Sequence, residues 1–168
     1  MKISLACSLA AFILAAGCGA GGKHTTTVYT KNGTTTVTTA NNGKTTSIQS
    51  QEGQMTVGQG AVDASKLGAP IYPGATQSSD QAAANINVAS GSSALAAFST
   101  SDSFDKVYSW YKERMPAGSE KARFTQGTSS MAEFVTGQQP TGQTMVMVTQ
   151  KGAQTQITIT HSVQKRSP

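Results

Sequence analysis

Thr144-Met-Val-Met-Val-Thr-Gln150 and Gln154-Thr-Gln-Ile-Thr-Ile-Thr-His161, joined by Lys151-Gly152, are the stretch that decides the fold of this chain. The first run alternates methionine with valine, so both faces of its strand are apolar, which is typical of a strand in the middle of a sheet. In the second run Ile157 and Ile159 alternate with threonine, which predicts one buried face and one wet face. Together the runs predict two long antiparallel strands.

One amphipathic helix is predicted upstream, at about residues 104–115. Its apolar side chains fall at i, i+3, i+4, i+7 and i+11, a spacing that places them on one helical face; they are Phe104, Val107, Tyr108, Tyr111 and Met115. Ser101-Asp-Ser103 supplies candidates for the N-cap, and Pro116-Ala-Gly118 ends the helix.

Four further segments carry strand signals, two before the helix and two after it. They are residues 86–89, 95–100, 122–126 and 131–135, with Ser90-Gly91-Ser92 as the loop between the first two. An antiparallel sheet with one helix packed on a face satisfies this order of elements, so the predicted fold class is α+β.

Residues 25–60 form a Thr-rich repeat with a period of nine to ten residues. Each unit is a β-branched run closed by a glycine, and Asn32-Gly33 and Asn42-Gly43 suit tight hairpin turns. Each run holds about one large aliphatic residue; these are Val28, Val37, Ile48 and Val57. The repeat predicts a four-stranded β-meander, or the rungs of a small solenoid. Its aliphatic face either packs onto the second half, or the segment is a partly ordered stalk with an adhesive Thr-rich surface.

The amino terminus has the pattern of an export signal. Met1-Lys2 is positively charged, and Ile3 to Leu14 is apolar apart from two serines. This apolar stretch of 12 residues is too short for a transmembrane helix, which needs about 20 residues. A positive start, an apolar stretch and a small-residue cleavage site together predict a secretory signal peptide.

Leu14-Ala15-Ala16-Gly17-Cys18 resembles the lipobox of bacterial lipoproteins, with Ala15 at a position where leucine is commonest. The resemblance covers the first 18 residues. It implies that Cys18 receives a thioether-linked diacylglycerol and becomes the new amino terminus; the alternative is ordinary secretion with Cys18 free. Gly19, in place of aspartate, implies an outer-membrane destination in a Gram-negative cell, facing the periplasm or the surface.

Cysteine usage agrees with a lipid on Cys18. Cys7 leaves with the predicted leader, so Cys18 is the single cysteine of the mature chain and no intramolecular disulfide can form. A lone free thiol in an oxidising exported compartment would be a liability. Two or three acyl chains, such as palmitate, anchor a protein stably, because each buried CH₂ contributes about 0.8 kcal/mol.

A second resemblance involves Leu67-Gly-Ala-Pro-Ile-Tyr-Pro-Gly-Ala75 and the segment from Phe98 to Tyr111. These stretches are similar to a group of small exported bacterial proteins that share this proline-rich corner, followed by strands and an aromatic helix. The resemblance covers roughly residues 62–161. It implies an architecture and no activity.

The predicted organisation therefore has five parts. They are a signal peptide (1–17), a lipidated tether (18–24), the Thr-rich repeat (25–60), an α+β domain (62–163) and a carboxy-terminal tail (164–168).

Charge is sparse along the chain. Charged residues make up 12% of it, against about 25% in an average soluble domain. Loss of Lys2 leaves 12 basic and 8 acidic residues, a formal charge of +4. Such a balance permits contact with polyanionic polymers of the envelope, but the basic residues are dispersed, as on an ordinary solvated surface. No nucleic-acid partner is predicted.

No catalytic or metal centre is predicted. The two histidines, His24 and His161, are too few for a zinc site that lacks cysteine, and His161 is predicted to be a surface-facing polar residue. No Gly-x-Ser-x-Gly elbow or phosphate-binding glycine loop is present, and no cofactor is predicted. The carboxylates suit helix capping or a solvated surface; they are Asp102, Asp105, Glu113, Glu120 and Glu133.

The strongest binding feature is an aromatic and basic patch on the helix. Trp110 lies in sequence beside three basic residues, and two more follow the helix; the five are Lys106, Lys112, Arg114, Lys121 and Arg123. An exposed tryptophan with basic neighbours is typical of a contact surface for a protein, a glycan or a lipid headgroup. The alternative is that Trp110 closes the rim of the core.

These features predict an exported, membrane-anchored envelope lipoprotein that is a binding or assembly module and not an enzyme. The alternative is a hydrolase acting on envelope material, which would need a pocket where His161 or a carboxylate meets a serine or a water molecule.

Overall fold

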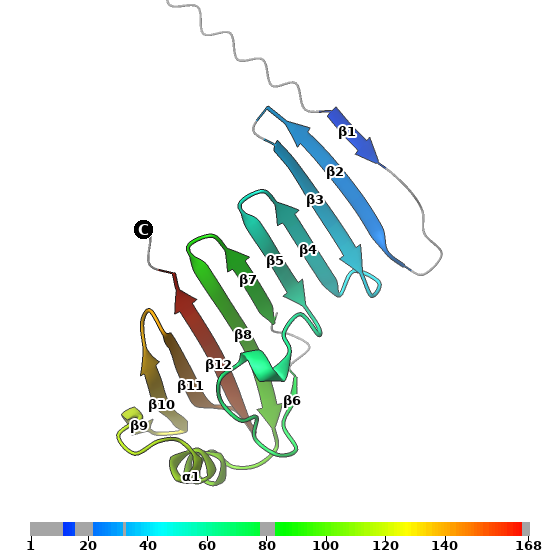
Figure 1. Ribbon diagram of the computed structural model, residues 1–168. Helices are drawn as coiled ribbons and strands as arrows, with labels where there is room; N and C mark the ends of the chain where they lie inside the picture. The colour runs from blue at the N-terminus through cyan, green and yellow to red at the C-terminus, as the bar shows by residue number, and fades with distance from the viewer. Residues whose placement is uncertain (1–11, 16–21, 32, 78–82, 166–168) are drawn as a thin grey trace, which may run out of the picture.

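The computed structural model describes residues 12–15, 22–31, 33–77 and 83–165. These residues form one antiparallel sheet of 12 strands with one α-helix packed against it (Figure 1). The strands follow the order β1-β2-β3-β4-β5-β7-β8-β12-β11-β10-β9, and the short β6 pairs with β8. The predicted α+β class, an antiparallel sheet with a single helix on one face, is confirmed.

The bounds of the elements are as follows. The first part of the chain contains β1 (Phe12–Ala15), β2 (His24–Thr30), β3 (Gly33–Ala40), β4 (Thr45–Ser50), β5 (Gly53–Gly58), a 3₁₀ turn η1 (Ala64–Lys66) and β6 (Thr76–Gln77). The second part contains β7 (Ala84–Val88), β8 (Gly91–Thr100), α1 (Phe104–Arg114), β9 (Glu120–Gln126), β10 (Ser129–Gln138), β11 (Gly142–Lys151) and β12 (Gln154–Gln164).

The core lies between α1 and the strands β8, β12, β11 and β10. The helix begins after the N-cap Ser103, whose hydroxyl accepts a hydrogen bond from the amide of Lys106, and it buries the predicted apolar face. Val146 and Val148 of β11 and Ile157 and Ile159 of β12 are completely buried beneath it. The hydroxyl of Tyr111 on α1 donates to the carbonyl of Pro70 at 3.0 Å, which ties the proline-rich corner to the helix.

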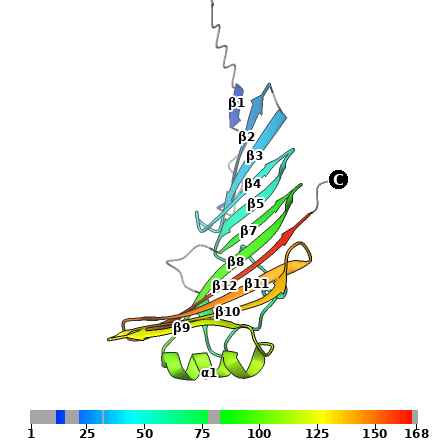
Figure 2. The same cartoon turned by 90° about the vertical axis from the view of Figure 1, so that its left-hand side faces the viewer.

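The Thr-rich repeat forms strands β2 to β5, and the predicted meander is confirmed. Of the two alternatives left open for the repeat, the one in which its aliphatic face packs onto the second half is wrong. The repeat instead joins the second half edge to edge, because β5 pairs with β7 and places Met55 opposite Ile86. Backbone hydrogen bonds of the sheet therefore connect the two halves, and no described element covers either face of β2 to β5 (Figure 2).

The sheet is curved, with α1 on its outer side (Figure 2). We call the face that contacts α1 the convex face and the opposite one the concave face. On the convex face of the repeat, hydroxyl groups pair across strands, Thr25 with Thr38 at 3.3 Å and Ser47 with Thr56 at 2.7 Å. Such pairs stabilise a sheet that has little core of its own.

Cys18 and most of the predicted signal peptide lie outside the described residues. β1 belongs to the predicted leader and pairs with β2, where Ile13 lies opposite Val28. Cleavage before Cys18 would remove β1 and leave β2 at the edge of the sheet. The part of the chain that the structure describes contains no helix of the length and hydrophobicity needed to cross a membrane.

One predicted loop belongs to a strand. The sequence predicts Gly91 and Ser92 between two strands, but β8 begins at Gly91, and the turn is made by Ala89 and Ser90. Gly91 is buried, with a φ angle of +156°, against the backbone of β12. The prediction is wrong because glycine in a sequence suggests a turn, while here it permits a close approach of two strands.

Candidate functional site

The basic residues of the predicted patch are mostly paired with carboxylates. Each of four cations has an acidic partner: Lys106 with Asp102 (3.0 Å), Lys112 with Glu120 (3.5 Å), Arg114 with Glu113 (3.5 Å) and Arg123 with Asp105 (3.0 Å). Lys121 donates to the carbonyl of Gly118. Five cations and four carboxylates leave this surface with a formal charge of +1, so it offers little attraction to a polyanion.

The aromatic side chains divide the patch between two sides of α1. Arg123 lies over the ring of Tyr108, 4.1 Å from its centroid, while Arg114 lies 4.5 Å over Trp110. Residues two apart on a helix do not face each other, so these two clusters point in different directions. Trp110 is half-buried and packs edge-on against Tyr72 and Tyr111, with centroids 5.3 and 4.8 Å apart. These contacts favour the alternative in which Trp110 closes the rim of the core over that of an exposed binding residue.

Asp102 is held in a network that fixes its charge. Its carboxylate accepts hydrogen bonds from the hydroxyl of Tyr72 at 2.7 Å and from Lys106 at 3.0 Å. The hydrogen bond from Tyr72, followed by that from Lys106, lowers the pKa of Asp102 below its ordinary value. A carboxylate held ionised in this way is poorly suited to donate a proton in hydrolysis.

His161 occupies a different environment from the one predicted. It lies on the convex face with Ile157 and Ile159, and it is partly buried. Its Nδ1 is 2.8 Å from the hydroxyl oxygen of the buried Thr144. The prediction of a surface-facing histidine is wrong because His161 lies on the same face of β12 as Ile157 and Ile159. The turn at Gly68 packs against its ring there.

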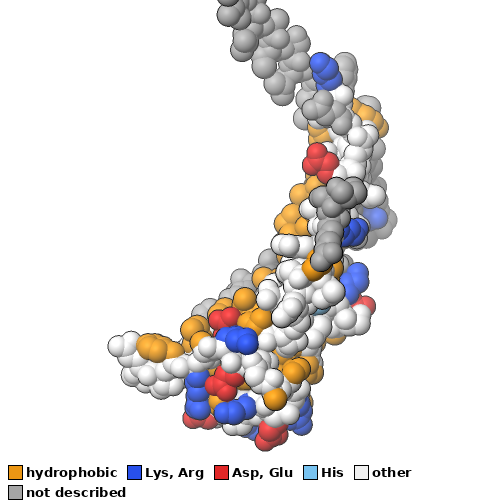
Figure 3. Space-filling model, turned by 60° about the vertical axis from the view of Figure 1, so that its left-hand side comes forward, with side chains coloured by type: hydrophobic (Ala, Val, Ile, Leu, Met, Phe, Trp, Pro, Cys, Tyr) orange, Lys and Arg blue, Asp and Glu red, His pale blue; other side chains and the backbone are white. Residues whose placement is uncertain are grey.

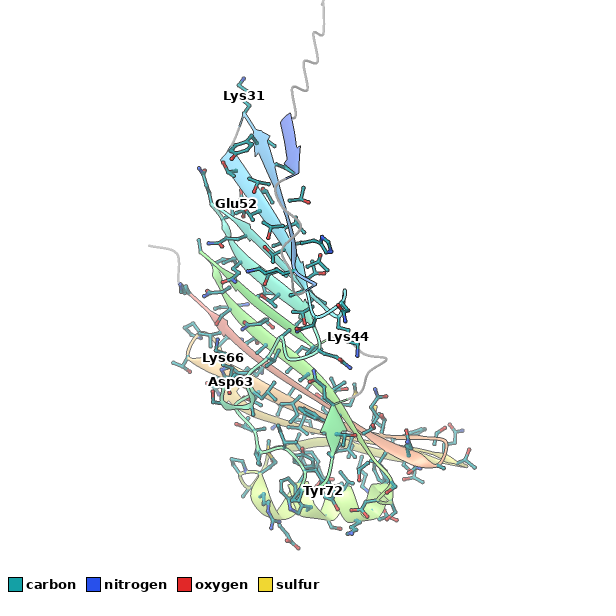
Figure 4. All side chains as sticks on the ribbon, turned by 90° about the vertical axis from the view of Figure 1, so that its right-hand side faces the viewer. Lys31, Lys44, Glu52, Asp63, Lys66 and Tyr72 are labelled. Atoms are coloured by element: carbon teal, nitrogen blue, oxygen red, sulfur yellow. The ribbon has the colours of Figure 1, made fainter. Side chains whose placement is uncertain are left out.

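A pocket of about 350 Å³ opens beside His161. Three parts of the chain build it: the turn around η1, the adjoining strands β7 and β8, and the end of β12. Its lining residues are Ser65, Lys66, Gly68, Asn85, Asn87, Ser92, Ser93, Ala94, His161 and Val163. Figure 4 labels Lys66 and Asp63 on this turn, well separated from Tyr72 beside α1.

Most residues of this pocket were missed by the sequence analysis. Lys66, Asn85 and Asn87 become neighbours of His161 only when the segment after the repeat folds back over the convex face. One signal was available in the sequence: the alternation Asn85-Ile86-Asn87 places two amides on the same face of a strand.

The concave face carries an apolar stripe that crosses the sheet from β2 to β9. The cross-strand registers align its aliphatic and aromatic side chains, and on β12 Thr160 lies between Leu95 and Met145. The stripe contains Val28, Val37, Ile48, Met55, Val57, Ile86, Leu95, Met145, Met147, Val135, Met131 and Phe124. Figure 3 shows hydrophobic side chains along the hollow side of the molecule. Ile48, Met55 and Met145 are each 38% exposed and Phe124 is 51% exposed.

Within the described ranges, no three histidine, cysteine, aspartate or glutamate residues gather in a group that could hold a metal ion. Comparisons with protein-family models, with curated proteins and with solved structures found no match. The pocket, the stripe and the amino-terminal motif are therefore the features from which a function can be inferred.

Proposed function

We propose that this chain is an envelope lipoprotein, anchored by acyl chains on Cys18, that binds a partner protein on its concave face without catalysing a reaction. The observation that carries the proposal is the apolar stripe, which has apolar side chains on nine of the ten strands from β2 to β9, with Thr160 on the tenth, and is covered by no other described element. Monomeric soluble proteins seldom expose large contiguous apolar surfaces, and those that do use them for interaction.

The composition of the concave face suits a protein partner. Ten strands about 4.8 Å apart make a surface roughly 43 Å long, which is ample for the 20–30 residues that each side of a standard interface contributes. Glu133 is the only residue charged at pH 7 among the strand side chains described on this face. Threonine, glutamine and serine border the stripe. An apolar centre depleted in charge with a polar rim is the composition of protein–protein interfaces.

The alternative of a hydrolase receives less support. His161 does lie in a pocket with serines, but its described hydrogen-bond partner is the hydroxyl of Thr144. A catalytic histidine needs a nucleophile on one ring nitrogen and an orienting group on the other. No hydrogen bond between His161 and a serine or a carboxylate is present among the described residues.

Anchoring at Cys18 would keep the stripe close to the membrane. His24, at the start of β2, follows Cys18 by six positions, a tether that spans at most about 20 Å. The partner expected on the concave face is therefore another protein of the same membrane or one that acts next to it.

Replacement of Cys18 tests the anchor. In cells fed a palmitate analogue, the wild-type protein is expected to carry the label and to sediment with membranes. Cys18→Ala is expected to lose the label completely, because the thioether sulfur is gone. In-gel detection of the label and mass spectrometry of the amino-terminal peptide provide the measurement. An intact leader, or Cys18 at the new amino terminus with a free thiol, would contradict the anchoring.

Two substitutions on β4 test the binding face. Ile48 is on the concave face, and its neighbour Gln49 is on the convex face. Ile48→Lys is expected to reduce recovery of a crosslinked partner protein at least tenfold, because a charge would be buried in the interface. Gln49→Lys makes the same charge change on the same strand and is expected to leave recovery unchanged. Quantitative mass spectrometry after crosslinking in cells measures both, and equal recovery from the two variants would count against the concave face.

A further inference from the structure

We propose that the pocket beside His161 binds a hydroxyl-rich ligand that carries one carboxylate, the chemistry of a uronic acid sugar. The pocket is on the convex side of the sheet, so this inference goes beyond the partner proposed for the concave face and does not depend on it. Its basis is the set of polar groups in the lining, their charge and the way His161 is held.

The charge of the lining is positive. Lys66 contributes an ammonium group, and the lining contains no carboxylate. Asp63, the nearest acid of the same turn, lies outside the lining and is engaged with Ser65, whose amide and hydroxyl both donate to it at 2.9 Å. No described ion pair occupies Lys66. The hydrogen bonds from Ser65, and after them the charge of Lys66, lower the pKa of the Asp63 carboxyl, so the charge of Lys66 does reach Asp63. One cation in a lining without a carboxylate suits one anionic group on the ligand.

The ring of His161 is positioned before a ligand arrives. Nδ1 shares a hydrogen bond with the hydroxyl of Thr144, whose donor depends on the tautomer of the ring, and Nε2 lies on the side of Gly142, where a Cβ would be 3.5 Å from it. Gly68 allows this arrangement, because a Cβ at that position would lie 2.5 Å from Oγ1 of Thr144 and 2.7 Å from Nδ1 of His161. The glycine therefore lets the turn around η1 close directly over the histidine.

The remaining polar groups suit hydroxyls. Asn85 and Asn87 each offer two donors and one acceptor, and Ser92 offers a hydroxyl that both donates and accepts. The hydroxyl of Ser65 donates to Asp63, so it offers the ligand its oxygen as an acceptor. Sugar hydroxyls require this mixture of donors and acceptors, whereas a bare inorganic anion requires donors alone. The volume of about 350 Å³ is at the small end of ligand pockets, which suits one or two sugar rings.

The test is an NMR titration of the purified full chain with D-glucuronate, with D-glucose and acetate as the two partial ligands. Glucuronate is expected to shift the amide signals of Asn85, Asn87 and Ser92 and to bind at least tenfold more tightly than either glucose or acetate. Acetate binding as tightly as glucuronate would mean a simple anion site and would overturn the proposal. Glucose binding as tightly as glucuronate would also overturn it, because Lys66 would then contribute nothing.

Substitutions distinguish an effect of the pocket on binding from an effect of the net charge or of misfolding. Lys66→Ala is expected to weaken glucuronate binding about tenfold or more, because it removes the charge-assisted contact. Lys44→Ala removes the same charge from a turn outside the pocket and is expected to have no effect. His161→Gln, a change at a position away from the fully buried core, is expected to weaken binding as well. Unchanged affinity in both pocket variants, with native amide spectra, would refute the site.

Discussion

Phe134→Ala is expected to lower the free energy of unfolding by about 3–5 kcal/mol, because it removes an aromatic side chain from the centre of the core. Phe134 lies on β10 beneath α1 and is completely buried. Its ring is 5.9 Å from that of Tyr108 and 6.2 Å from that of Tyr111. Both helix residues would therefore lose a partner, and the cavity would lie between helix and sheet.

The neighbouring strand offers a matched control. Phe124 on β9 is on the concave face and is 51% exposed. Phe124→Ala makes the same chemical change and is expected to cost less than about 1 kcal/mol, because much of the side chain is already in water. Urea denaturation followed by circular dichroism measures both. A similar loss from the two substitutions would show that α1 does not cover the principal core.

Gly91→Ala is expected to lower the free energy of unfolding by about 2–5 kcal/mol, through backbone strain and steric overlap. Gly91 has a φ angle of +156°, a conformation that residues with a side chain rarely adopt. A Cβ there would lie 2.2 Å from the carbonyl oxygen of Val163 on β12. That oxygen belongs to the backbone of a central strand, so relief of the overlap requires β8 and β12 to move apart.

Gly127→Ala serves as the comparison. Gly127 is in the exposed turn between β9 and β10, with a φ angle of +58°, and a Cβ at this position would have no atom within 4 Å. Its substitution is expected to cost about 1 kcal/mol, the penalty of the left-handed conformation alone. Thermal unfolding of the two variants beside the wild type measures the difference. A Gly91→Ala protein as stable as Gly127→Ala would mean that the two strands are not held this closely.

Local sequence patterns predicted most of the secondary structure. The helical spacing from Phe104 to Met115 identified both the helix and its buried face, because an amphipathic period leaves few alternatives. The runs around Val146 and Ile157 identified the central strands for the same reason. The Asn-Gly pairs and the Thr-rich runs identified the meander, because the preference of β-branched residues for strands and of Asn-Gly for tight turns depends on the local sequence alone.

Features that depend on distant parts of the chain were not predictable from these patterns. The pairing of β5 with β7 is set by the path of the chain between them, and either edge pairing or face packing could bury part of the repeat. The environment of His161 depends on the turn around η1 and on Gly68, which are more than 90 positions away in the sequence. Two of the four ion pairs in the patch join α1 to β9, and in the other two Lys106 pairs with Asp102 and Arg114 with Glu113. A count of basic residues along the helix therefore overestimates its charge.

The strands β2 to β5 form a single layer that sets the distance between the amino terminus and the helix-covered end of the sheet. Its strands lie side by side along the path from the amino terminus to α1, and each adds about 4.8 Å to that path. Because these strands contribute nothing to the core beneath α1, a hairpin of two repeat units could be gained or lost without disturbing the helix-covered end. In the lipid-anchored protein that we propose, a change in the number of repeat strands would therefore alter the distance from the anchored amino terminus to the pocket in steps of roughly 10 Å.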